Sequence, residues 1–213
     1  MFDKLEFIHR KGYRPDTILD IGAYHGKWTD EMSSIFTDST FHLFEAINYP
    51  ELAEFNNVHN VLLNDKKECV NWYQMKNTGD SMFKENSKCF DNCEVIQRES
   101  IDLDTYISNN NLLQDSKNIF IKIDCQGAEI PILKGATSIL DRTDFILLEV
   151  PLFGQYNAGV PSFSEHILFM ESIGFVIYDV VECHFINGFN MQVDVVFINK
   201  KHPYNTEVNN LTF

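Results

Sequence analysis

TILDIGAYHGKW, residues 17–28, is an apolar run that ends in a turn with glycines at positions 22 and 26. Glycine in such a turn lets the backbone come close to a ligand, and a helix that follows it offers free N–H groups. The turn lacks the G-x-G-x-x-G pattern of dinucleotide-binding folds, and Asp20 stands where the first glycine of that pattern would be. Because a carboxylate suits an amino group or a cation better than a phosphate, we expect a cationic, nucleoside-like ligand here.

Strand and helix patterns alternate on both sides of this turn. Apolar runs typical of buried strands occur at residues 17–23, 40–46, 58–64, 118–125, 144–150, 175–185 and 191–200. Amphipathic stretches predict helices at 1–12, 27–36, 50–56, 128–140 and 162–174, the last with Ser162 as N-cap and Gly174 at its end. The alternation predicts an α/β fold with a mostly parallel sheet, helices on both faces and one antiparallel strand near the C-terminus.

Residues 64–118 fit this alternation least well, and we expect them to form an irregular, insertion-like segment. Within it, residues 69–75 and 93–100 have extended patterns, 77–90 is typical of a polar loop, and a short helix is expected at 101–107. The chain has neither an internal repeat nor a linker-like stretch. All of it, residues 1–213, is therefore predicted to form a single domain.

The composition is that of a globular protein with an acidic excess. The 213 residues carry a net charge of -14 and the basic residues are scattered, so a nucleic-acid substrate is disfavoured. No stretch approaches the roughly 20 apolar residues that span a bilayer, and the charged first residues are not typical of a secretory signal. These features predict a cytoplasmic protein that does not enter a membrane.

The five cysteines indicate reduced thiols rather than disulfides, because their number is odd and no secretory signal is recognised. Cys89 and Cys93 form the only close pair. No second pair or histidine cluster completes the four ligands of a structural zinc site, so no zinc site is predicted.

Two carboxylates end the first two strands of the expected sheet, Asp20 and Glu45. Ligands of such sheets bind beyond the carboxyl ends of the strands, and an acidic residue after the second strand binds ribose hydroxyls in dinucleotide folds. S-adenosylmethionine has ribose hydroxyls, an amino group and a positive charge but no phosphate, so both carboxylates fit it as a cofactor. The alternative is that Asp20 caps the following helix and Glu45 is a surface charge.

Beyond these patterns, the chain from Pro15 to Lys200 resembles the FkbM family of S-adenosylmethionine-dependent methyltransferases. The matching stretches are ILDIGAYHGKWT, FEA, LLNDKKECVNWY, SIDLDTYI, FIKIDCQGAEIPILKGA, ILLEV and VDVVFINK. KIDCQGAE, residues 122–129, is the most specific of them. The resemblance implies a Rossmann-like class I methyltransferase fold with a seven-stranded sheet. It also implies methyl transfer to a hydroxyl group of a sugar, a glycan or another small metabolite.

The resemblance further implies which residues hold the cofactor. Its methionine end would lie against Asp20, Gly22, Ala23 and Gly26, its ribose against Glu45, its adenine near Asn64 and Asp65, and its methyl group beside Asp124. Two positions depart from the family pattern, since Tyr24 stands where Asn is usual and Ala46 where Pro is usual. The departures concern contacts at the mouth of the site.

Asp124 and Glu149 end neighbouring strands of the expected sheet, and these strand ends are expected to face the transferred methyl group. Either residue could deprotonate the acceptor, or the two could hold a divalent cation that polarises it, although no metal is predicted. Glu149 could instead be structural, paired with Lys122 or with a backbone amide. His184 is a weaker candidate for the base, and it could simply pack.

Two loops are expected near this site. TGDSMFKEN, residues 78–86, could fold over it, and residues 150–160 are typical of a lid with hinges at Gly154 and Gly159. Glu129 is expected to tie its helix to the loops rather than to meet the substrate.

Three other functions stay open at this point. A nicotinamide-dependent oxidoreductase would need the third glycine that the turn lacks. A nucleic-acid methyltransferase on the same fold would need a basic face. A catalytically inactive cofactor-binding module that serves as a partner subunit would keep Asp20, Glu45 and Asp124, and only turnover separates it from an enzyme.

Overall fold

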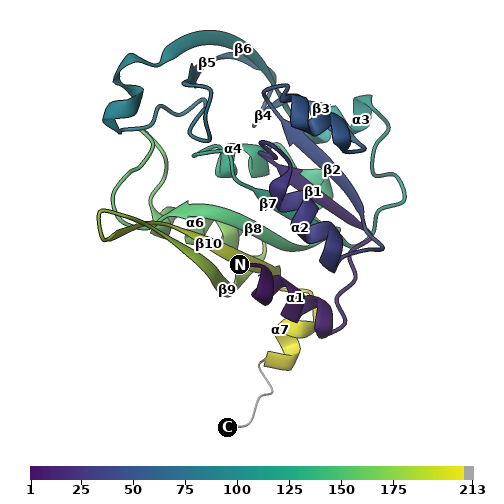
Figure 1. Cartoon of the computed structure of the whole chain (residues 1–213). Coiled ribbons are helices and arrows are strands. Elements are labelled where there is room, and N and C mark those ends of the chain that lie inside the picture. Colours follow the sequence, from purple (N-terminus) through teal and green to yellow (C-terminus); the bar gives the residue numbers. More distant parts are fainter. Residues whose placement is uncertain (209–213) are drawn as a thin grey trace.

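The computed structural model describes residues 1–208 and contains two β-sheets (Figure 1). The larger sheet has seven strands, in the spatial order β3 (Val58–Asn60), β2 (Thr40–Glu45), β1 (Thr17–Ile21), β7 (Ile119–Ile123), β8 (Thr143–Pro151), β10 (Phe189–Asn199) and β9 (Phe175–Ile186). β10 is antiparallel to both of its neighbours, and the other pairs are parallel. The predicted sheet and its antiparallel strand are confirmed.

The central strands β1 and β7 are buried along their whole length. Continuous apolar runs suit such strands because helices cover both faces of a parallel sheet. Leu19 and Ile21 face one apolar cluster and Ile18 faces the other. Asp20 shares the side of Ile18, because successive side chains of a strand point to opposite faces. It lies opposite Lys122 in the β1–β7 ladder, so two charged residues meet inside the core.

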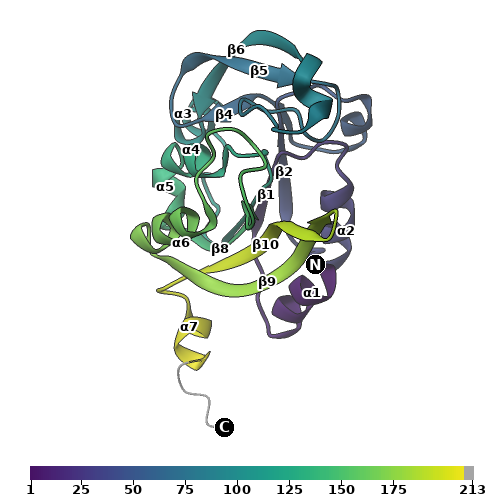
Figure 2. The same cartoon turned by 90° about the vertical axis from the view of Figure 1, so that its left-hand side faces the viewer.

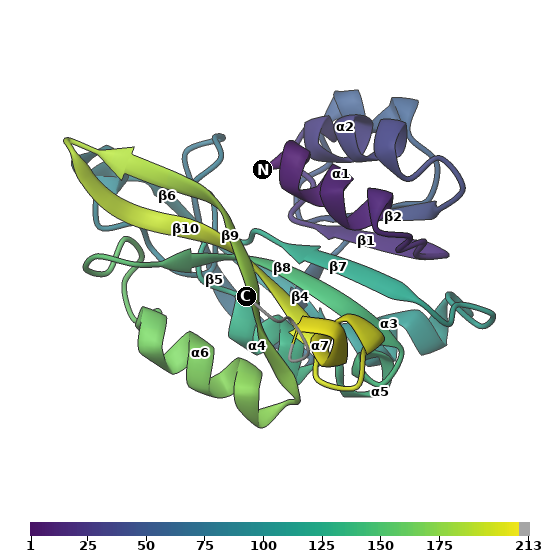
Figure 3. The ribbon, with the colours of Figure 1, turned by 90° about the horizontal axis from the view of Figure 1, so that it is seen from below.

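Helices cover both faces of the large sheet (Figure 3). On one face lie α1 (Phe2–Arg10) and α2 (Lys27–Ile35). On the other lie α3 (Leu103–Asn109), α4 (Glu129–Lys134), α5 (Thr137–Leu140) and α6 (Phe163–Ser172). The 3-10 helices η1 (Pro50–Glu54) and η2 (Lys88–Asn92) and the helix α7 (Pro203–Val208) are further elements. The helices predicted at 1–12, 27–36 and 162–174 are confirmed, with ends shifted by a few residues.

The single helix predicted at 128–140 is wrong, because the structure divides it into α4 and α5. A Cβ atom at Gly135 would lie 2.5 Å from the carbonyl oxygen of Asn64 and 2.8 Å from Cβ of Asp102. The Gly135 carbonyl accepts a hydrogen bond from the backbone N–H of Asp104 (2.9 Å). The close approach of these distant segments ends α4 at the glycine.

Residues 64–118, expected to be irregular and insertion-like, are regular where extended patterns were predicted, at 69–75 and 93–100. They contain β5 (Glu68–Gln74) and β6 (Glu94–Asp102), which form the smaller sheet with β4 (Leu62–Asn64) in the order β4-β6-β5. The strand predicted at 58–64 is divided at Val61 between the two sheets. Many side chains of β5 and β6 are exposed, which weakens the apolar pattern of these strands. The smaller sheet forms the top of the molecule in Figures 1 and 2.

Local rules explain the C-terminal part of the fold. Ser162 and Glu165 form the predicted capping box at the start of α6. Asn187 and Gly188 have φ angles of 52° and 83°, as the two-residue turn of a β-hairpin requires. They join β9 to β10, as predicted. Among residues 1–208, no helix combines the length and apolar character needed to cross a membrane.

Candidate functional site

A cavity of about 600 Å³, counting its open mouth, lies at the carboxyl ends of β1, β2 and β7. Open α/β sheets bind their ligands at this edge. Gly22, Glu45 and Asp124, which end or follow the three strands, form one side of the cavity. The other walls come largely from apolar side chains, among them Ile47, Leu62, Trp72 and Met82. We call it the first cavity.

Gly22 brings the turn after β1 into contact with the end of β7. Its φ is 77°, and a Cβ atom at this position would lie 2.0 Å from the carbonyl oxygen of Asp124. Ala23 and Gly26 lie behind the turn: Ala23 is buried among apolar side chains, and a Cβ at Gly26 would lie 2.3 Å from the ring of Phe55. Of the three small residues predicted to hold the cofactor, Gly22 is the one in the cavity wall.

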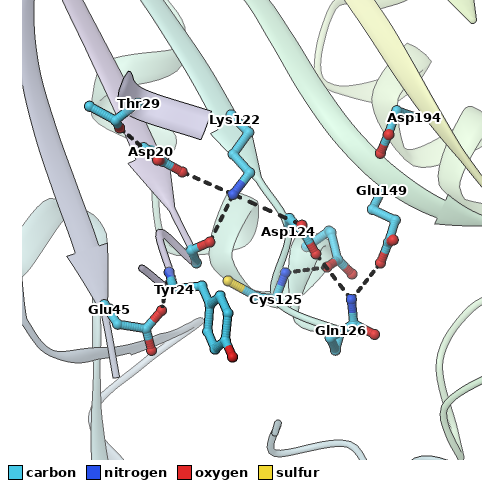
Figure 4. Close-up of polar contacts among 12 residues, drawn as sticks. Asp20, Tyr24, Thr29, Glu45, Lys122, Asp124, Cys125, Gln126, Glu149 and Asp194 are labelled. Carbon is cyan, nitrogen blue, oxygen red and sulfur yellow. Dashed lines mark hydrogen bonds and ion pairs between the residues drawn. The ribbon is translucent and has the colours of Figure 1, made fainter. Parts of the chain in front are cut away.

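Glu45 holds the turn in place through its carboxylate. Oε2 accepts a hydrogen bond from the backbone N–H of Tyr24 (2.7 Å; Figure 4). Oε1 accepts one from the backbone N–H of Ile47 (3.0 Å). Burial raises the pKa of Glu45, and the two backbone donors oppose the rise. Each carboxylate oxygen has a second lone pair, so Glu45 can still accept hydrogen bonds from hydroxyl groups in the cavity.

Tyr24 is held at the mouth of the first cavity in an uncommon backbone conformation. Its φ is 50°, a region that side chains other than Asn and Asp rarely occupy. The Tyr24 ring stacks on His25, with centroids 3.8 Å apart, and meets the ring of Tyr49 edge-on at 5.0 Å. Tyr24 and Tyr49 both line the cavity. The mouth is therefore aromatic where the family pattern has Asn.

Asp20 lies behind the turn and is fully buried. Its Oδ1 accepts a hydrogen bond from Nζ of Lys122 (2.9 Å), and its Oδ2 accepts one from the hydroxyl of Thr29 (2.7 Å) (Figure 4). Nζ of Lys122 also donates to the Gly22 carbonyl (2.8 Å) and lies 4.0 Å from Asp124. Burial alone would lower the pKa of Lys122, but Asp20 and Asp124 outweigh it and the pKa is raised.

The structure therefore does not bring the predicted residue Asp20 to the wall of the first cavity. Its carboxylate fixes Lys122 and the start of α2, and Lys122 in turn holds the turn carbonyl. The alternative in which Asp20 caps the following helix is also wrong, because Gly26 is the N-cap of α2 and Asp20 accepts from the side-chain hydroxyl of Thr29 rather than from a backbone N–H.

Asn64 and Asp65 also lie outside the first cavity, although an adenine was expected near them. They line a separate surface hollow, and Nδ2 of Asn64 donates to Glu68 Oε1 (3.0 Å). The physical reason is the division of the predicted strand at Val61, because β4 carries Asn64 into the smaller sheet. Leu62 of the same strand lines the first cavity instead.

A second cavity adjoins the first and measures about 850 Å³ with its open mouth. Four residues line both cavities: Asn77, Thr78, Asp124 and Gln126. Glu149 and Gln192, from β8 and β10, line the second cavity. Asp124 therefore stands between two spaces, an arrangement that suits a reaction between two bound molecules.

Gln126 joins the two carboxylates that the sequence predicted to be catalytic (Figure 4). Its Nε2 donates to Asp124 Oδ1 (3.1 Å) and to Glu149 Oε2 (2.7 Å). Nε2 of Gln192 donates to the same oxygen of Glu149 (2.8 Å). Glu149 thus pairs with side-chain amides and not with Lys122, which the sequence analysis considered as its partner. Gln126 belongs to the KIDCQGAE run, but its role was not predicted.

His184 and Asp194 extend this group of side chains. Nε2 of His184 lies 2.8 Å from Asp194 Oδ2, and this hydrogen bond raises the pKa of His184. Glu149 lies beside them, and each of the three offers an atom within 4.8 Å of the others. Burial, and after it the charges of Asp124 and Asp194, raise the pKa of Glu149 well above its ordinary value. The sequence singled out His184 but not Asp194.

Glu129 has the structural role that was predicted for it. Its Oε1 accepts hydrogen bonds from the backbone N–H groups of Cys125 (2.9 Å) and Gly127 (3.2 Å). The carboxyl group is buried, and this burial raises the pKa of Glu129 to about 7. Its other oxygen is buried without a hydrogen-bond partner among the described residues. Glu129 thus ties α4 to the loop that carries Gln126.

Two loops form part of the wall of the second cavity together. Glu85 and Asn157 form an antiparallel bridge, and the backbone N–H groups of Asn86 and Ala158 donate to the carbonyls of Tyr156 and Lys84 (2.8 Å each). The loop predicted as a lid, 150–160, is therefore paired with the loop 78–86. Its proposed hinges, Gly154 and Gly159, have φ angles of 77° and 80°.

The loop 78–86 is also anchored at the junction of the two cavities. The Ser81 hydroxyl lies 3.1 Å from the carbonyl oxygen of Cys125 and 3.0 Å from that of Gln126. Ser81 and Met82 line the first cavity, while Gly79 and Glu85 line the second. The expectation that this loop folds over the site agrees with these contacts.

Comparison with known proteins gives one family and a set of similar structures. A family model described as methyltransferase FkbM domain matches residues 20–177. No curated protein sequence matches the chain. The structure resembles the methyltransferase FkbM from Methylobacillus flagellatus KT, with a TM-score of 0.52 and 13% identity over 86% of this chain and 43% of that one. The chain thus spans less than half the length of that protein.

Two further structures have similar scores. One is the Burkholderia thailandensis 1,6-didemethyltoxoflavin-N1-methyltransferase with bound 1,6-didemethyltoxoflavin and S-adenosylhomocysteine, with a TM-score of 0.51 and 11% identity over 93% of this chain and 76% of that one. The other comes from a fibrillarin/Nop5p complex, with a TM-score of 0.51 and 15% identity over 92% and 80%. At these identities the similarity concerns the fold, which is the Rossmann-like fold of class I methyltransferases.

Proposed function

Because the chain belongs to the FkbM methyltransferase family, we propose that it transfers a methyl group from S-adenosylmethionine to a hydroxyl group of a sugar, a glycan or another small metabolite. The observation that carries this proposal is the pair of adjoining cavities, which share Asp124 and Gln126. In this proposal, the cofactor occupies the first cavity and the acceptor occupies the second cavity.

The residues of the first cavity fit the cofactor in chemistry. Glu45 is available to ribose hydroxyls, and the apolar wall near Ile47 and Trp72 suits a purine ring. Asp124 carries a negative charge toward a sulfonium group, with 42% of its side chain exposed.

The residues around Asp124 provide orientation and a place for the proton. S-adenosylmethionine supplies an electrophilic methyl group, and the acceptor oxygen has to lie in line with its bond to sulfur. Orientation of this kind contributes up to about 7–11 kcal/mol in the best cases. Asp124 and Glu149, joined by Gln126, hold the acceptor hydroxyl and take up its proton. A positioned base of this kind typically adds about 10²–10⁴-fold to the rate.

Cofactor binding is tested by thermal unfolding with S-adenosylmethionine, S-adenosylhomocysteine or NAD. A ligand at 100 times its dissociation constant stabilises the folded state by about 2.7 kcal/mol. The first two ligands should raise the unfolding temperature and NAD should not. Gly22→Ala should abolish the effect, because the added Cβ meets the Asp124 carbonyl at 2.0 Å. Stabilisation by NAD alone would contradict the proposal.

Turnover is tested with a panel of glycans and small alcohols, by measuring formation of S-adenosylhomocysteine. Glu149→Gln should lower kcat by about 10²–10⁴-fold while the stabilisation by S-adenosylmethionine stays. Glu182→Gln, a change of a half-exposed carboxylate on β9, is the matched control and should leave kcat unchanged. Cofactor binding without turnover on any acceptor would instead indicate an inactive partner module, and methylation of nucleic acid would also contradict the proposal.

A further inference from the structure

We propose that Glu149, His184 and Asp194 bind one divalent transition-metal ion at the edge of the second cavity. The ion site is inferred from the arrangement of the three side chains alone. Its role in catalysis rests, in addition, on the proposed function.

The three side chains come from three neighbouring strands and lie on one face of the sheet. Asp194 in β10 is opposite Glu149 in β8, and Gln192 in β10 is opposite His184 in β9. Residues directly opposite each other in an antiparallel ladder point to the same face, as do residues two apart in one strand. The ladder thus collects an imidazole and two carboxylates on the same face.

The distances suit ligands of one ion. Nε2 of His184 lies 2.8 Å from Asp194 Oδ2, and one ligand atom from each of the three residues lies within 4.8 Å of the others. Metal–nitrogen and metal–oxygen bonds of about 2.0–2.2 Å place neighbouring ligands roughly 3 Å apart. Small rotations of Glu149 therefore complete the set.

Charge also favours a cation at this point. Asp194 is 6% exposed, Glu149 is half-buried, and Asp124 lines the same space. Lys122 lines this space too, but its ammonium group is held by Asp20 and by the Gly22 carbonyl. Buried carboxylates that lack a cation repel each other. A bound divalent ion removes this repulsion.

Room for the remaining ligands of the ion is present. A third cavity of about 380 Å³, counting its open part, is lined by Lys122, Asp124, Glu149, His184 and Asp194. Glu149 and Asp124 also line the second cavity. An ion held by three protein ligands keeps open positions, which water or an acceptor oxygen can occupy.

The ligand set selects the kind of ion. Magnesium and calcium prefer oxygen ligands, whereas imidazole suits first-row transition metals such as manganese, cobalt and zinc. We therefore expect Co²⁺ and Mn²⁺ to bind more tightly than Mg²⁺. Within the proposed reaction the ion polarises the acceptor hydroxyl. Asp124 is then the carboxylate left free to take up the proton.

The ion site is tested by titrating the tag-free, full-length chain with Co²⁺ and recording the visible absorption of the bound ion. One equivalent should bind, and excess Mg²⁺ should not displace it. His184→Ala and Asp194→Asn should each raise the dissociation constant for Co²⁺ at least about tenfold. His184→Gln serves as a second variant, and circular dichroism verifies that all variants fold.

Two matched controls separate this site from unspecific attraction. Glu182→Gln removes a carboxylate that lies opposite Asp194 on β9 but outside the ligand set. His59→Gln breaks the contact between His42 and His59 (3.0 Å), two histidines on β2 and β3 that lie outside the ligand set. Neither control should weaken Co²⁺ binding. The ion site is overturned if a control weakens Co²⁺ binding as much as the His184 and Asp194 variants do. It is also overturned if the His184 and Asp194 variants bind Co²⁺ as tightly as the wild type.

The role of the ion is tested separately from its binding. Chelator-treated protein should lose methyl transfer, and Co²⁺ or Mn²⁺ should restore it. Co²⁺ binding in a protein without any methyl transfer overturns the proposed function and leaves the ion site standing. Methyl transfer at full rate in chelator-treated protein overturns the catalytic role of the ion but not the proposed function.

Discussion

At the residue scale, Lys122 holds together the buried charges behind the turn that follows β1. It pairs with Asp20, which is fully buried, and also holds the Gly22 carbonyl. A buried ion pair adds little net stability, but removal of one partner leaves the other charge without compensation.

We expect Lys122→Met to lower the free energy of unfolding by about 3–5 kcal/mol, because it leaves the Asp20 carboxylate buried and unpaired. Urea denaturation measures the change. The double variant Lys122→Met/Asp20→Asn is the control and should be clearly more stable than the single variant. Equal stability of the wild type and Lys122→Met would show that the pair does not support the fold.

Glu129 should make stability depend on pH. Its pKa in the folded protein is about 7 because of burial, against an ordinary value of 4.5. Between these two pH values the folded state retains a proton that the unfolded state has lost. The free energy of unfolding should therefore fall as the pH rises from about 4.5 to about 7.

Urea denaturation at pH 5 and pH 8 checks this dependence. Glu129→Gln should lose less stability than the wild type between the two pH values. The exposed carboxylate of Glu171 provides the control, and Glu171→Gln should retain the slope of the wild type. If the free energy of unfolding depended on pH in the same way in all three proteins, the assignment of the retained proton to Glu129 would be contradicted.

For single residues, the sequence predicted which side chains lie at the carboxyl ends of the strands. Asp124 follows β7 and Glu149 lies near the end of β8, so their convergence at one sheet edge was foreseeable from the pattern. The partners of these residues were not, because they depend on strand register. Asp194 meets His184 through the β9–β10 ladder, which contains bulges. Lys122 pairs with Asp20 because Asp20 lies directly opposite it in β1, whereas Leu147 and not Glu149 lies opposite it in β8.

At the scale of elements, Gly135 explains why the single helix predicted at 128–140 is divided into α4 and α5. It is the point where the end of α4 touches the β4 carbonyl of Asn64 and the N-cap residue of α3, Asp102. The contact joins three elements that are far apart in the sequence.

Gly135→Ala should lower the free energy of unfolding by about 1–3 kcal/mol, because the added Cβ would lie 2.5 Å from a backbone oxygen. Thermal or urea unfolding measures this change. Lys134→Ala, at the exposed neighbouring position of the same helix, is the matched control and should change stability by less than about 0.5 kcal/mol. An unchanged free energy of unfolding in Gly135→Ala would show that the surroundings of Gly135 can accommodate the added Cβ.

Elements with strong local signals were predicted well, and elements defined by distant contacts were not. The capping box at Ser162 and the turn at Asn187–Gly188 are encoded within a few residues. The strand at 58–64 was misjudged because its apolar run does not reveal that its two halves enter different sheets. β5 and β6 were recognised as extended stretches, but their pairing with β4 in a separate sheet was not predicted, because it depends on contacts between distant segments.

At the scale of the whole molecule, two histidines link the edge of the large sheet to α3. Nδ1 of His42 lies 3.0 Å from Nε2 of His59, and the ring of His59 stacks on Phe44 and meets Tyr106 edge-on. Burial, and after it the neighbouring His42, lower the pKa of His59 to about 4.

A neutral His59 is therefore part of the folded state, while the unfolded chain takes up a proton near pH 6.5. The unfolded state binds more protons between these values, so stability should fall as the pH is lowered from about 6.5 to about 4. His59→Gln should lose less stability than the wild type between pH 7 and pH 5, measured by urea denaturation. A slope unchanged by His59→Gln would contradict the assignment.

The paired loops 84–86 and 156–158 have a consequence for how acceptors could be exchanged. Each loop supplies backbone partners to the other, and the second cavity draws Glu85 and Tyr156 from them. Lengthening or replacing one loop alone would leave the backbone N–H and carbonyl groups of the other loop without their hydrogen-bond partners. New acceptor preferences should therefore arise from a co-ordinated change of both loops, transferred together as one unit, while the first cavity is left unchanged.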